Sequence, residues 1–190
     1  EREAQLLAGL RHANLPRVSD HFVLPGQGQY LVMDFVEGKS LSGLLAARGG
    51  PLNEAEVLPW IRQVCDALEY LHTRTPPVIH RDIKPDNIII GPDGRAMLVD
   101  FGISKVYEEN KGTTIGAKAV TPGYSPPEQY GSGRTDARSD VYALGATLYT
   151  LLTGQVPPDG PDLASELEAL LPAVAVNPVV SETTSGAISA

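Results

Sequence analysis

The sequence has little that would suit a disulfide-rich, membrane-spanning or nucleic-acid-binding protein. Its 190 residues include one cysteine, Cys65, so no disulfide can form within the chain and a reducing, cytoplasmic compartment is expected. No apolar run approaches the length of a membrane span, although an anchor outside this stretch stays compatible with the sequence. Acidic residues outnumber basic ones by 23 to 15, and the net charge of −8 argues against a nucleic-acid partner.

The residues that are present predict a globular domain of mixed secondary structure. Apolar residues recur at helical spacing in five segments: 1–10, 41–47, 54–73, 139–153 and a weaker one at 163–171. Strands are expected in four short apolar runs beside turn residues: 18–24, 30–35, 88–90 and 96–99. Residues 103–127 show no period and are expected to form a long functional loop. This order of elements indicates an α+β fold.

Two of the predicted helices carry the clearest signals. Within 54–73 the apolar residues follow steps of three and four, and Cys65 is expected to pack in the interior beside them. Within 139–153, Ser139 is expected as the N-terminal cap and Val141 among the inward-facing residues.

The densest group of reactive side chains is His-Arg-Asp-Ile-Lys-Pro-Asp-Asn at residues 80–87, followed by Asp-Phe-Gly from Asp100. Asn87 and Asp100 offer the hard oxygen ligands that Mg²⁺ uses when it also binds phosphate. Asp82 can accept a proton from an attacking hydroxyl, and Lys84 can neutralise charge on a moving phosphoryl group. Either motif alone is also compatible with a polar loop whose Asp and Asn cap turns.

Together, in this order, the two motifs resemble the protein kinases. The resemblance implies roles for these residues: a catalytic base at Asp82, a phosphate-neutralising cation at Lys84, metal ligands at Asn87 and Asp100, and completion of the Asp-Phe-Gly motif by Phe101 and Gly102. It also implies Mg²⁺ and ATP as cofactors and a kinase-like fold with a mainly helical C-terminal lobe.

Further motifs resemble other parts of a kinase. Pro-Pro-Glu ending at Glu128 stands where kinases have Ala-Pro-Glu, and that glutamate is expected to pair with an arginine beyond this chain. Residues 139–145 resemble the start of the central helix of the C-terminal lobe, in which Asp140 would hold the catalytic loop through hydrogen bonds. Lys84 and Thr121 follow the serine/threonine-kinase pattern, and Thr121 would bond near Asp82.

The resemblance also implies that residues 30–38 form the part of the site that binds the nucleotide. The implied contacts are a gatekeeper at Met33, backbone groups of Asp34 and Val36 against the adenine, Ile89 beneath the base, and Glu3 as the helix glutamate that pairs with a strand lysine. Met33 and Ile89 are equally compatible with plain core packing, and Glu3 with a solvated charge.

Arg81 implies regulation, because it precedes the implied catalytic base Asp82. This pattern resembles kinases that are activated by phosphorylation of a loop. A phosphate on Thr113 or Thr114 would pair with Arg81 and order the loop, or these threonines are ordinary solvated residues. A regulatory hydrophobic column would contain four side chains: Leu7, Val18, His80 and Phe101.

The resemblance predicts a partial kinase domain. Residues 1–33 would be a remnant of the N-terminal lobe, 34–38 the hinge, and 39–190 a truncated C-terminal lobe. The chain opens without a methionine and contains no Gly-rich phosphate loop, which suggests a fragment. Alone, it is expected to transfer little phosphate.

The function expected from the resemblance is ATP-dependent phosphorylation of serine or threonine in protein substrates, as in bacterial kinases of the eukaryotic type. One alternative is a pseudokinase that binds or scaffolds. Another is a small-molecule phosphotransferase, which usually lacks the Pro-Glu element. The sequence contains no membrane segment.

Overall fold

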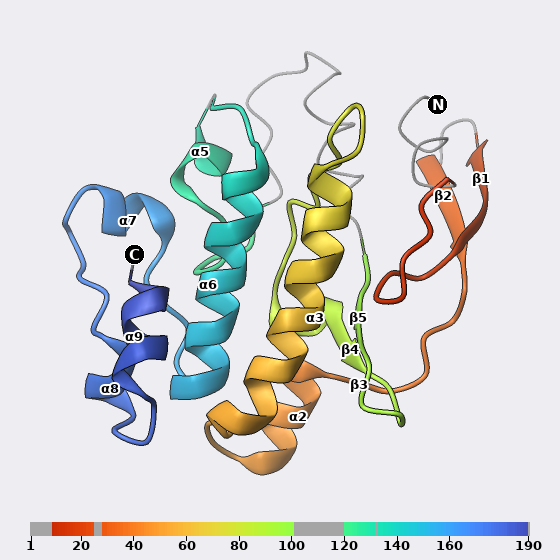
Figure 1. Cartoon of the computed structure of the whole chain (residues 1–190). Helices are drawn as coiled ribbons and strands as arrows, with labels where there is room; N and C mark the ends of the chain where they lie inside the picture. The colour runs from red at the N-terminus through yellow and green to blue at the C-terminus, as the bar shows by residue number, and fades with distance from the viewer. Residues whose placement is uncertain (1–8, 25–27, 101–119, 132, 190) are drawn as a thin grey trace.

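Figure 1 shows the computed structural model of the chain, which describes residues 9–24, 28–100, 120–131 and 133–189. Several sequence predictions fall outside these residues and stay untested by the fold. They are most of the helix predicted at 1–10, most of the loop predicted at 103–127, and the residues Glu3, Leu7, Phe101, Gly102, Thr113 and Thr114.

A two-stranded antiparallel sheet forms the N-terminal part of the described chain. Strands β1 (Val18–Leu24) and β2 (Gly28–Met33) pair with Val18 opposite Met33, and the register is irregular between Val18 and Asp20. The predicted hairpin is confirmed, but its second strand ends at Met33. Phe35, which the prediction placed in this strand, is 92% exposed.

A second, three-stranded antiparallel sheet has the order β3-β4-β5. It consists of β3 (Lys39–Ser40), β4 (Ile88–Ile90) and β5 (Ala96–Leu98), with Ile88 opposite Leu98. The turn between β4 and β5 contains Gly94 at φ 78°, a left-handed conformation that glycine adopts without strain.

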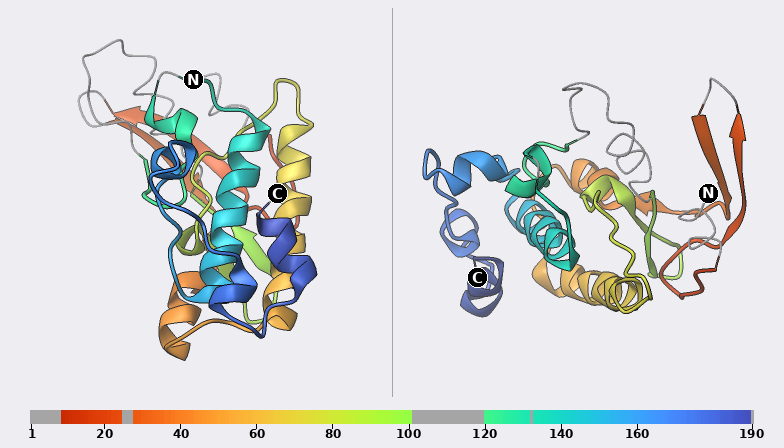
Figure 2. Two further views of the ribbon diagram at one scale, coloured as in Figure 1. Left: turned by 90° about the vertical axis from the view of Figure 1, so that its left-hand side faces the viewer. Right: turned by 90° about the horizontal axis from the view of Figure 1, so that it is seen from above.

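Helices make up most of the remaining described chain. They are α2 (Leu41–Arg48), α3 (Glu54–His72), the 3₁₀ helix η1 (Pro85–Asn87), α5 (Pro127–Tyr130), α6 (Ala137–Thr153), α7 (Gly160–Ala164), α8 (Ala173–Val176) and α9 (Glu182–Ile188). Figures 1 and 2 show α3 and α6 side by side in opposite directions, with α8 and α9 on the outer side of α6. The second sheet packs against the other side of α3. Among the described residues, no helix combines the length and apolar character needed to cross a membrane.

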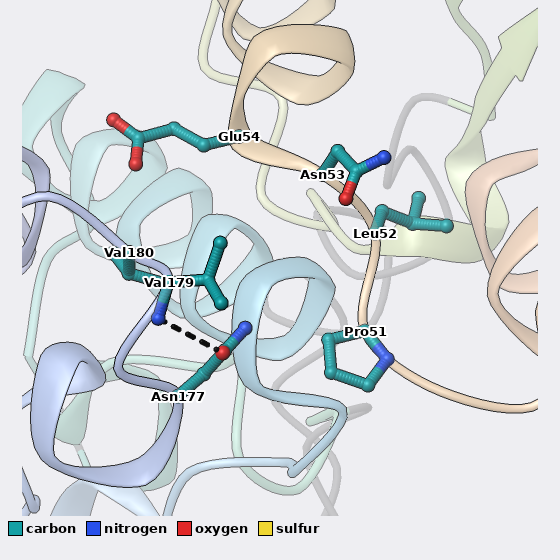
Figure 3. A pocket seen from close by; sticks show the side chains of 7 residues that line it. All are labelled: Pro51, Leu52, Asn53, Glu54, Asn177, Val179 and Val180. Atoms are coloured by element: carbon teal, nitrogen blue, oxygen red, sulfur yellow. Dashed lines mark hydrogen bonds between the residues drawn. The ribbon is translucent and has the colours of Figure 1, made fainter.

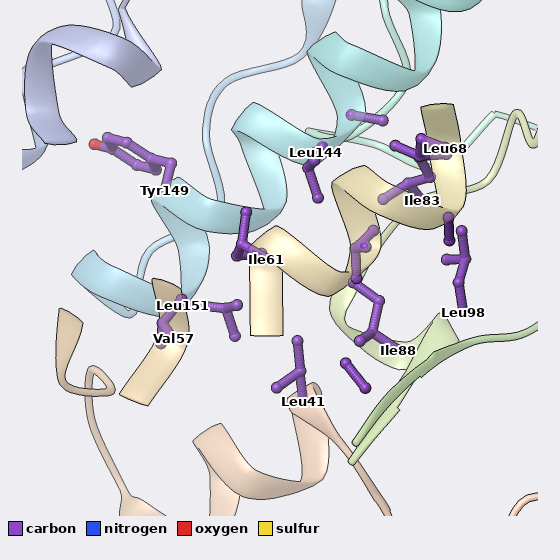
Figure 4. Close-up of a cluster of buried hydrophobic side chains, with 14 of the residues drawn as sticks. Leu41, Val57, Ile61, Leu68, Ile83, Ile88, Leu98, Leu144, Tyr149 and Leu151 are labelled. Atoms are coloured by element: carbon purple, nitrogen blue, oxygen red, sulfur yellow. The ribbon is translucent and has the colours of Figure 1, made fainter. Parts of the chain in front are cut away.

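The core lies between α3, α6, α2 and the second sheet (Figure 4). Its apolar side chains include Leu41, Val57, Ile61, Val64, Leu68, Leu71, Ile83, Ile88, Leu98, Leu144, Leu151 and Leu152. The helical spacing predicted within 54–73 is therefore confirmed. Cys65 is exposed, which corrects the prediction that it packs inside, because it lies outside the buried stripe of α3.

The start of α6 differs from the prediction. The helix begins at Ala137, its N-cap is Asp136, and Ser139 is the third helical residue of a capping box. Val141 is 62% exposed rather than inward-facing, while Leu144 and Leu151 are buried. The helix ends at Gly154, where φ is 73°.

The C-terminal part also departs from the prediction of one helix at 163–171. The chain forms α7 and α8 instead, with non-helical residues between them. Pro161 in the first turn of α7 favours an earlier start, and Glu166 has φ 57°, which is incompatible with a continuing helix.

The segment around α9 is held to the start of α3 by a carboxylate. Glu54 accepts hydrogen bonds from the Ser181 hydroxyl (2.7 Å) and the Thr184 hydroxyl (2.6 Å). These hydrogen bonds, that from Thr184 foremost, lower the pKa of Glu54. A cavity of about 80 Å³ lies beside this contact (Figure 3), lined by Pro51, Leu52, Asn53, Glu54, Asn177, Val179 and Val180.

Candidate active site

Asp140, in the first turn of α6, anchors the loop that carries the reactive residues. Its carboxylate is fully buried and accepts hydrogen bonds from the backbone N–H of His80 (2.9 Å) and of Arg81 (2.8 Å). The Nε2 atom of His72, at the end of α3, lies 2.7 Å from the same carboxylate. Because a carboxylate only accepts, His72 must carry a proton on Nε2. Asp140 therefore joins α3, α6 and the loop at one point.

The backbone of this loop is strained where Asp140 holds it. Arg81 has φ 68°, in the left-handed region that costs a residue other than glycine on the order of 1–3 kcal/mol. The hydrogen bond from Arg81 N–H to Asp140 fixes this conformation, and the Arg81 Nε atom donates to the hydroxyl of Thr135 (2.9 Å). Such strain persists only where surrounding contacts determine the backbone.

His80 is a buried, neutral link between the loop and the strand end. Its Nε2 atom lies 3.1 Å from the carbonyl oxygen of Val99, which can only accept, so the proton is on Nε2. Its Nδ1 atom then accepts a hydrogen bond from the Asp82 N–H (3.4 Å). Burial lowers the pKa of His80 below its ordinary value, and the charge of Asp140 offsets part of this effect.

Stability is expected to depend on His80 at mildly acidic pH. Because the folded-state pKa is lowered, the unfolded chain binds a proton near pH 6.5 while the folded chain does not. His80 therefore does not reduce the free energy of unfolding above pH 6.5. Below pH 6.5 the free energy of unfolding falls as the pH drops towards the pKa of His80 in the folded protein, by up to about 1.4 kcal/mol per pH unit. Between pH 7.5 and 5.5, urea unfolding should show a larger decrease in the free energy of unfolding for the wild type than for His80→Gln. Equal losses would contradict a neutral His80.

Asp82 lies at the centre of a group of polar side chains. Its Oδ1 accepts a hydrogen bond from the Thr121 hydroxyl (2.9 Å), and its Oδ2 accepts one from Asn87 Nδ2 (2.9 Å). The Lys84 ammonium lies 3.1 Å from the same Oδ2. The structure thus brings together four of the residues predicted from the sequence.

The orientation of the Asn87 amide is determined by its partners. Nδ2 donates both to the Asp82 carbonyl oxygen (2.7 Å) and to the Asp82 carboxylate, so Oδ1 is the atom that remains to bind a metal. The Asn87 carbonyl oxygen accepts from Val99 N–H (2.9 Å), which brings Asp100, the next residue, to this part of the site. Asp100 is exposed and has φ 57°.

Thr121 begins a tight turn that fixes its position. Its carbonyl oxygen accepts hydrogen bonds from the backbone N–H of Tyr124 (3.0 Å) and Ser125 (2.9 Å). Its own N–H donates to the Ser125 hydroxyl (2.9 Å). The contact between Thr121 and Asp82 therefore comes from an ordered backbone.

The residues predicted to bind the nucleotide lie at the end of β2, in the segment that follows it, and in β4. Met33 ends β2 and is partly buried against the core, and Asp34 N–H donates to the Arg17 carbonyl oxygen (2.9 Å). Within the described chain, no hydrogen bond uses the Asp34 carbonyl oxygen or the Val36 N–H. Ile89 is half-buried in β4.

Gly38 brings this segment close to β4. A Cβ atom at position 38 would collide with the Ile90 carbonyl oxygen and lie 2.8 Å from Ile89 Cγ2, so only glycine fits. The close approach places Ile89 next to the end of the 34–38 segment.

Sequence reasoning missed several contacts that complete the site. Glu128 accepts a hydrogen bond from the Ser139 hydroxyl (2.6 Å), and Gln129 Nε2 donates to the Arg81 carbonyl oxygen (3.2 Å). Neither these contacts nor that of His72 with Asp140 has a local sequence signal, because each partner is distant along the chain.

Comparison with known proteins identifies the family. The sequence profile of the protein kinase domain matches residues 1–180. The chain belongs to the protein kinase domain family. The α+β, kinase-like fold expected from the sequence is confirmed, as is the expected relation to bacterial serine/threonine kinases.

Similar kinases come from several bacteria. The chain is 38% identical over 167 residues to the serine/threonine-protein kinase pkn2 of Myxococcus xanthus, covering 85% of this chain and 20% of that protein. It is 36% identical over 164 residues to PrkC of Bacillus subtilis, covering 86% of this chain and 25% of that protein. The chain thus spans about a fifth to a quarter of these relatives.

Solved kinase structures share the fold. The apo form of PpkA-294 has a TM-score of 0.77 and 28% identity, covering 99% of this chain and 65% of that one. The PknI kinase domain of Mycobacterium tuberculosis has a TM-score of 0.71 and 30% identity, covering 93% of this chain and 63% of that one.

Proposed function

We propose that the protein transfers the γ-phosphoryl group of ATP to serine or threonine hydroxyls of other proteins. The observation that carries this proposal is the arrangement around Asp82, whose carboxylate contacts Lys84, Asn87 and Thr121 within 3.1 Å. Membership of the kinase family and the names of its bacterial relatives support the same activity.

The side chains present can each contribute a defined step. Asp82, fixed by Thr121 and Asn87, would orient the acceptor hydroxyl and take its proton. Lys84, which is 3.1 Å from Asp82, would offset the charge that develops on the transferred phosphoryl group. Holding these groups in place before substrate binds reduces the reorganisation required during transfer.

The residues near Asn87 fit magnesium. Its Oδ1 is the amide atom left for a ligand, and Asp100, which follows the Val99 that is hydrogen-bonded to the Asn87 backbone, offers an exposed carboxylate. No cluster of three or more His, Cys, Asp or Glu side chains suited to a metal occurs in the described ranges. A site of two protein ligands suits Mg²⁺, which keeps waters and takes phosphate oxygens as its other ligands. When bound, Mg²⁺ and ATP supply the reactive phosphoryl group and neutralise its charge.

The segment 34–38 fits an adenine edge. The Asp34 carbonyl oxygen offers an acceptor and the Val36 N–H offers a donor, and both lack partners within the described chain. Ile89 would lie against the base, with Met33 at the inner end. We propose residues 1–33 as part of the N-terminal lobe, 34–38 as the hinge, and 39–190 as part of the C-terminal lobe.

An acceptor panel tests this function. We expect the full-length protein to transfer labelled phosphate from ATP to serine or threonine in a basic protein such as histone or myelin basic protein. Sugars and aminoglycosides should stay unlabelled. Label on the small molecules alone would indicate a small-molecule phosphotransferase, and ATP binding without transfer to any acceptor would indicate a pseudokinase.

A further inference from the structure

Helix α5 is connected to two different parts of the site by neighbouring side chains. Gln129 Nε2 donates to the carbonyl oxygen of Arg81, in the catalytic loop. Glu128 Oε1 accepts from the hydroxyl of Ser139, in the first turn of α6. The Gln129 nitrogen must face Arg81, because a carbonyl oxygen can only accept.

These two contacts close a ring of hydrogen bonds. Arg81 N–H donates to Asp140, which follows Ser139 in α6, so the catalytic loop, α6 and α5 are each joined to the other two. Three residues of the ring are buried, namely Gln129 (8% exposed), Ser139 (2%) and Asp140 (0%), while Arg81 and Glu128 are partly exposed. Hydrogen bonds in such surroundings are costly to leave unmade.

The packing around Glu128 leaves little freedom for α5 to shift. A Cβ atom at Gly133 would lie 2.6 Å from Glu128 Cβ, so the chain after α5 passes directly against this side chain. The Ser139 hydroxyl also accepts from Asp136 N–H (3.2 Å), as part of the capping box that starts α6. Ser139 therefore serves the helix start and α5 together.

The segment from Thr121 to Tyr130 is consequently fixed at both ends. At its start Thr121 donates to Asp82, and near its end Gln129 donates to Arg81, the residue before Asp82. Between them, backbone bonds from Tyr124 and Ser125 to Thr121 keep the segment ordered.

We propose that Gln129 and Ser139 are positioning residues, which hold segment 121–130 in register with Asp82 and thereby set efficiency towards protein acceptors. This proposal rests on the proposed kinase function. Neither residue contacts the segment 34–38 that would bind the adenine, so the KM for ATP should be independent of both.

The test uses two variants of the full-length protein, Gln129→Met and Ser139→Ala. Each should lower kcat/KM for a protein acceptor about tenfold, which corresponds to the loss of one partly buried hydrogen bond, and leave the KM for ATP within twofold. Ser181→Ala is the matched control, because its hydroxyl makes a similar bond to Glu54 (2.7 Å) far from the site. The conservative variant Ser139→Thr should restore efficiency.

Backbone hydrogen exchange provides a second readout that does not require activity. The N–H groups of Tyr124, Ser125 and Gln129 should exchange faster in Gln129→Met and Ser139→Ala but not in Ser181→Ala. Unchanged exchange at these three positions would overturn the proposal. Equal decreases in kcat/KM in Gln129→Met, Ser139→Ala and the control Ser181→Ala would also overturn it. If the wild type transfers no phosphate, the kinase function fails, and exchange alone still decides whether the two side chains hold the segment.

Discussion

Replacing Asp140 with alanine is expected to lower the free energy of unfolding by about 3–5 kcal/mol and to abolish phosphoryl transfer. The carboxylate is fully buried and serves His72 and the backbone N–H groups of His80 and Arg81. Each buried donor left without a partner costs about 1–3 kcal/mol. The strained backbone at Arg81 would also lose the contact that holds it.

Urea unfolding of Asp140→Ala beside Asp136→Ala measures this effect. Asp136 is also a carboxylate at the start of α6, but it is half-exposed and caps the helix through the N–H of Arg138 (2.8 Å). Its replacement should cost about 1 kcal/mol, the usual contribution of an N-cap. A similar cost for the two variants would show that Asp140 only stabilises the helix end.

Replacing Asp82 with asparagine is expected to lower kcat by about 10²–10⁴-fold, the usual contribution of a general base. The asparagine has the same size but cannot take a proton from an acceptor hydroxyl. Asn87 still has the backbone carbonyl oxygen of residue 82 as a partner (2.7 Å), so the loop should keep its fold. Stability and ATP affinity should change little.

Asp86→Asn is the matched control for this substitution. Asp86 lies in the same loop, is exposed, and accepts a hydrogen bond from the Ser42 hydroxyl (2.8 Å) rather than from the residues around Asp82. At saturating substrate it should keep kcat within a few-fold of the wild type. Comparable rates for Asp82→Asn and the wild type would remove Asp82 from the proposed mechanism.

The sequence was most informative where structure depends on short-range pattern. The apolar spacing in α3 predicted the buried residues Val57 to Leu71, because one helical face repeats every three to four positions. The end of the helix predicted at 139–153 also agrees with the structure, because Gly154, the next residue, adopts a left-handed conformation that glycine tolerates locally. The motif at 80–87 predicted that Asp82, Lys84 and Asn87 lie together, since they share one loop.

Prediction failed where contacts between distant segments decide the outcome. Ser139 was predicted as a cap, but Asp136 takes that position and leaves Ser139 to contact Glu128. Val141 is apolar yet exposed, because α6 buries a different face against α3. The partnership of His72 with Asp140 depends on how α3 and α6 pack, which no local pattern specifies.

The residues around Asp82 and segment 34–38 are proposed to form one site for ATP and an acceptor hydroxyl. A crystal structure of the full-length protein with Mg²⁺ and a non-hydrolysable ATP analogue would show whether they do. We expect the metal on Asn87 and Asp100, the adenine on the backbone of Asp34 and Val36, and Lys84 beside the terminal phosphate. Nucleotide bound elsewhere, or bound with its phosphates away from Asp82, would contradict this proposal.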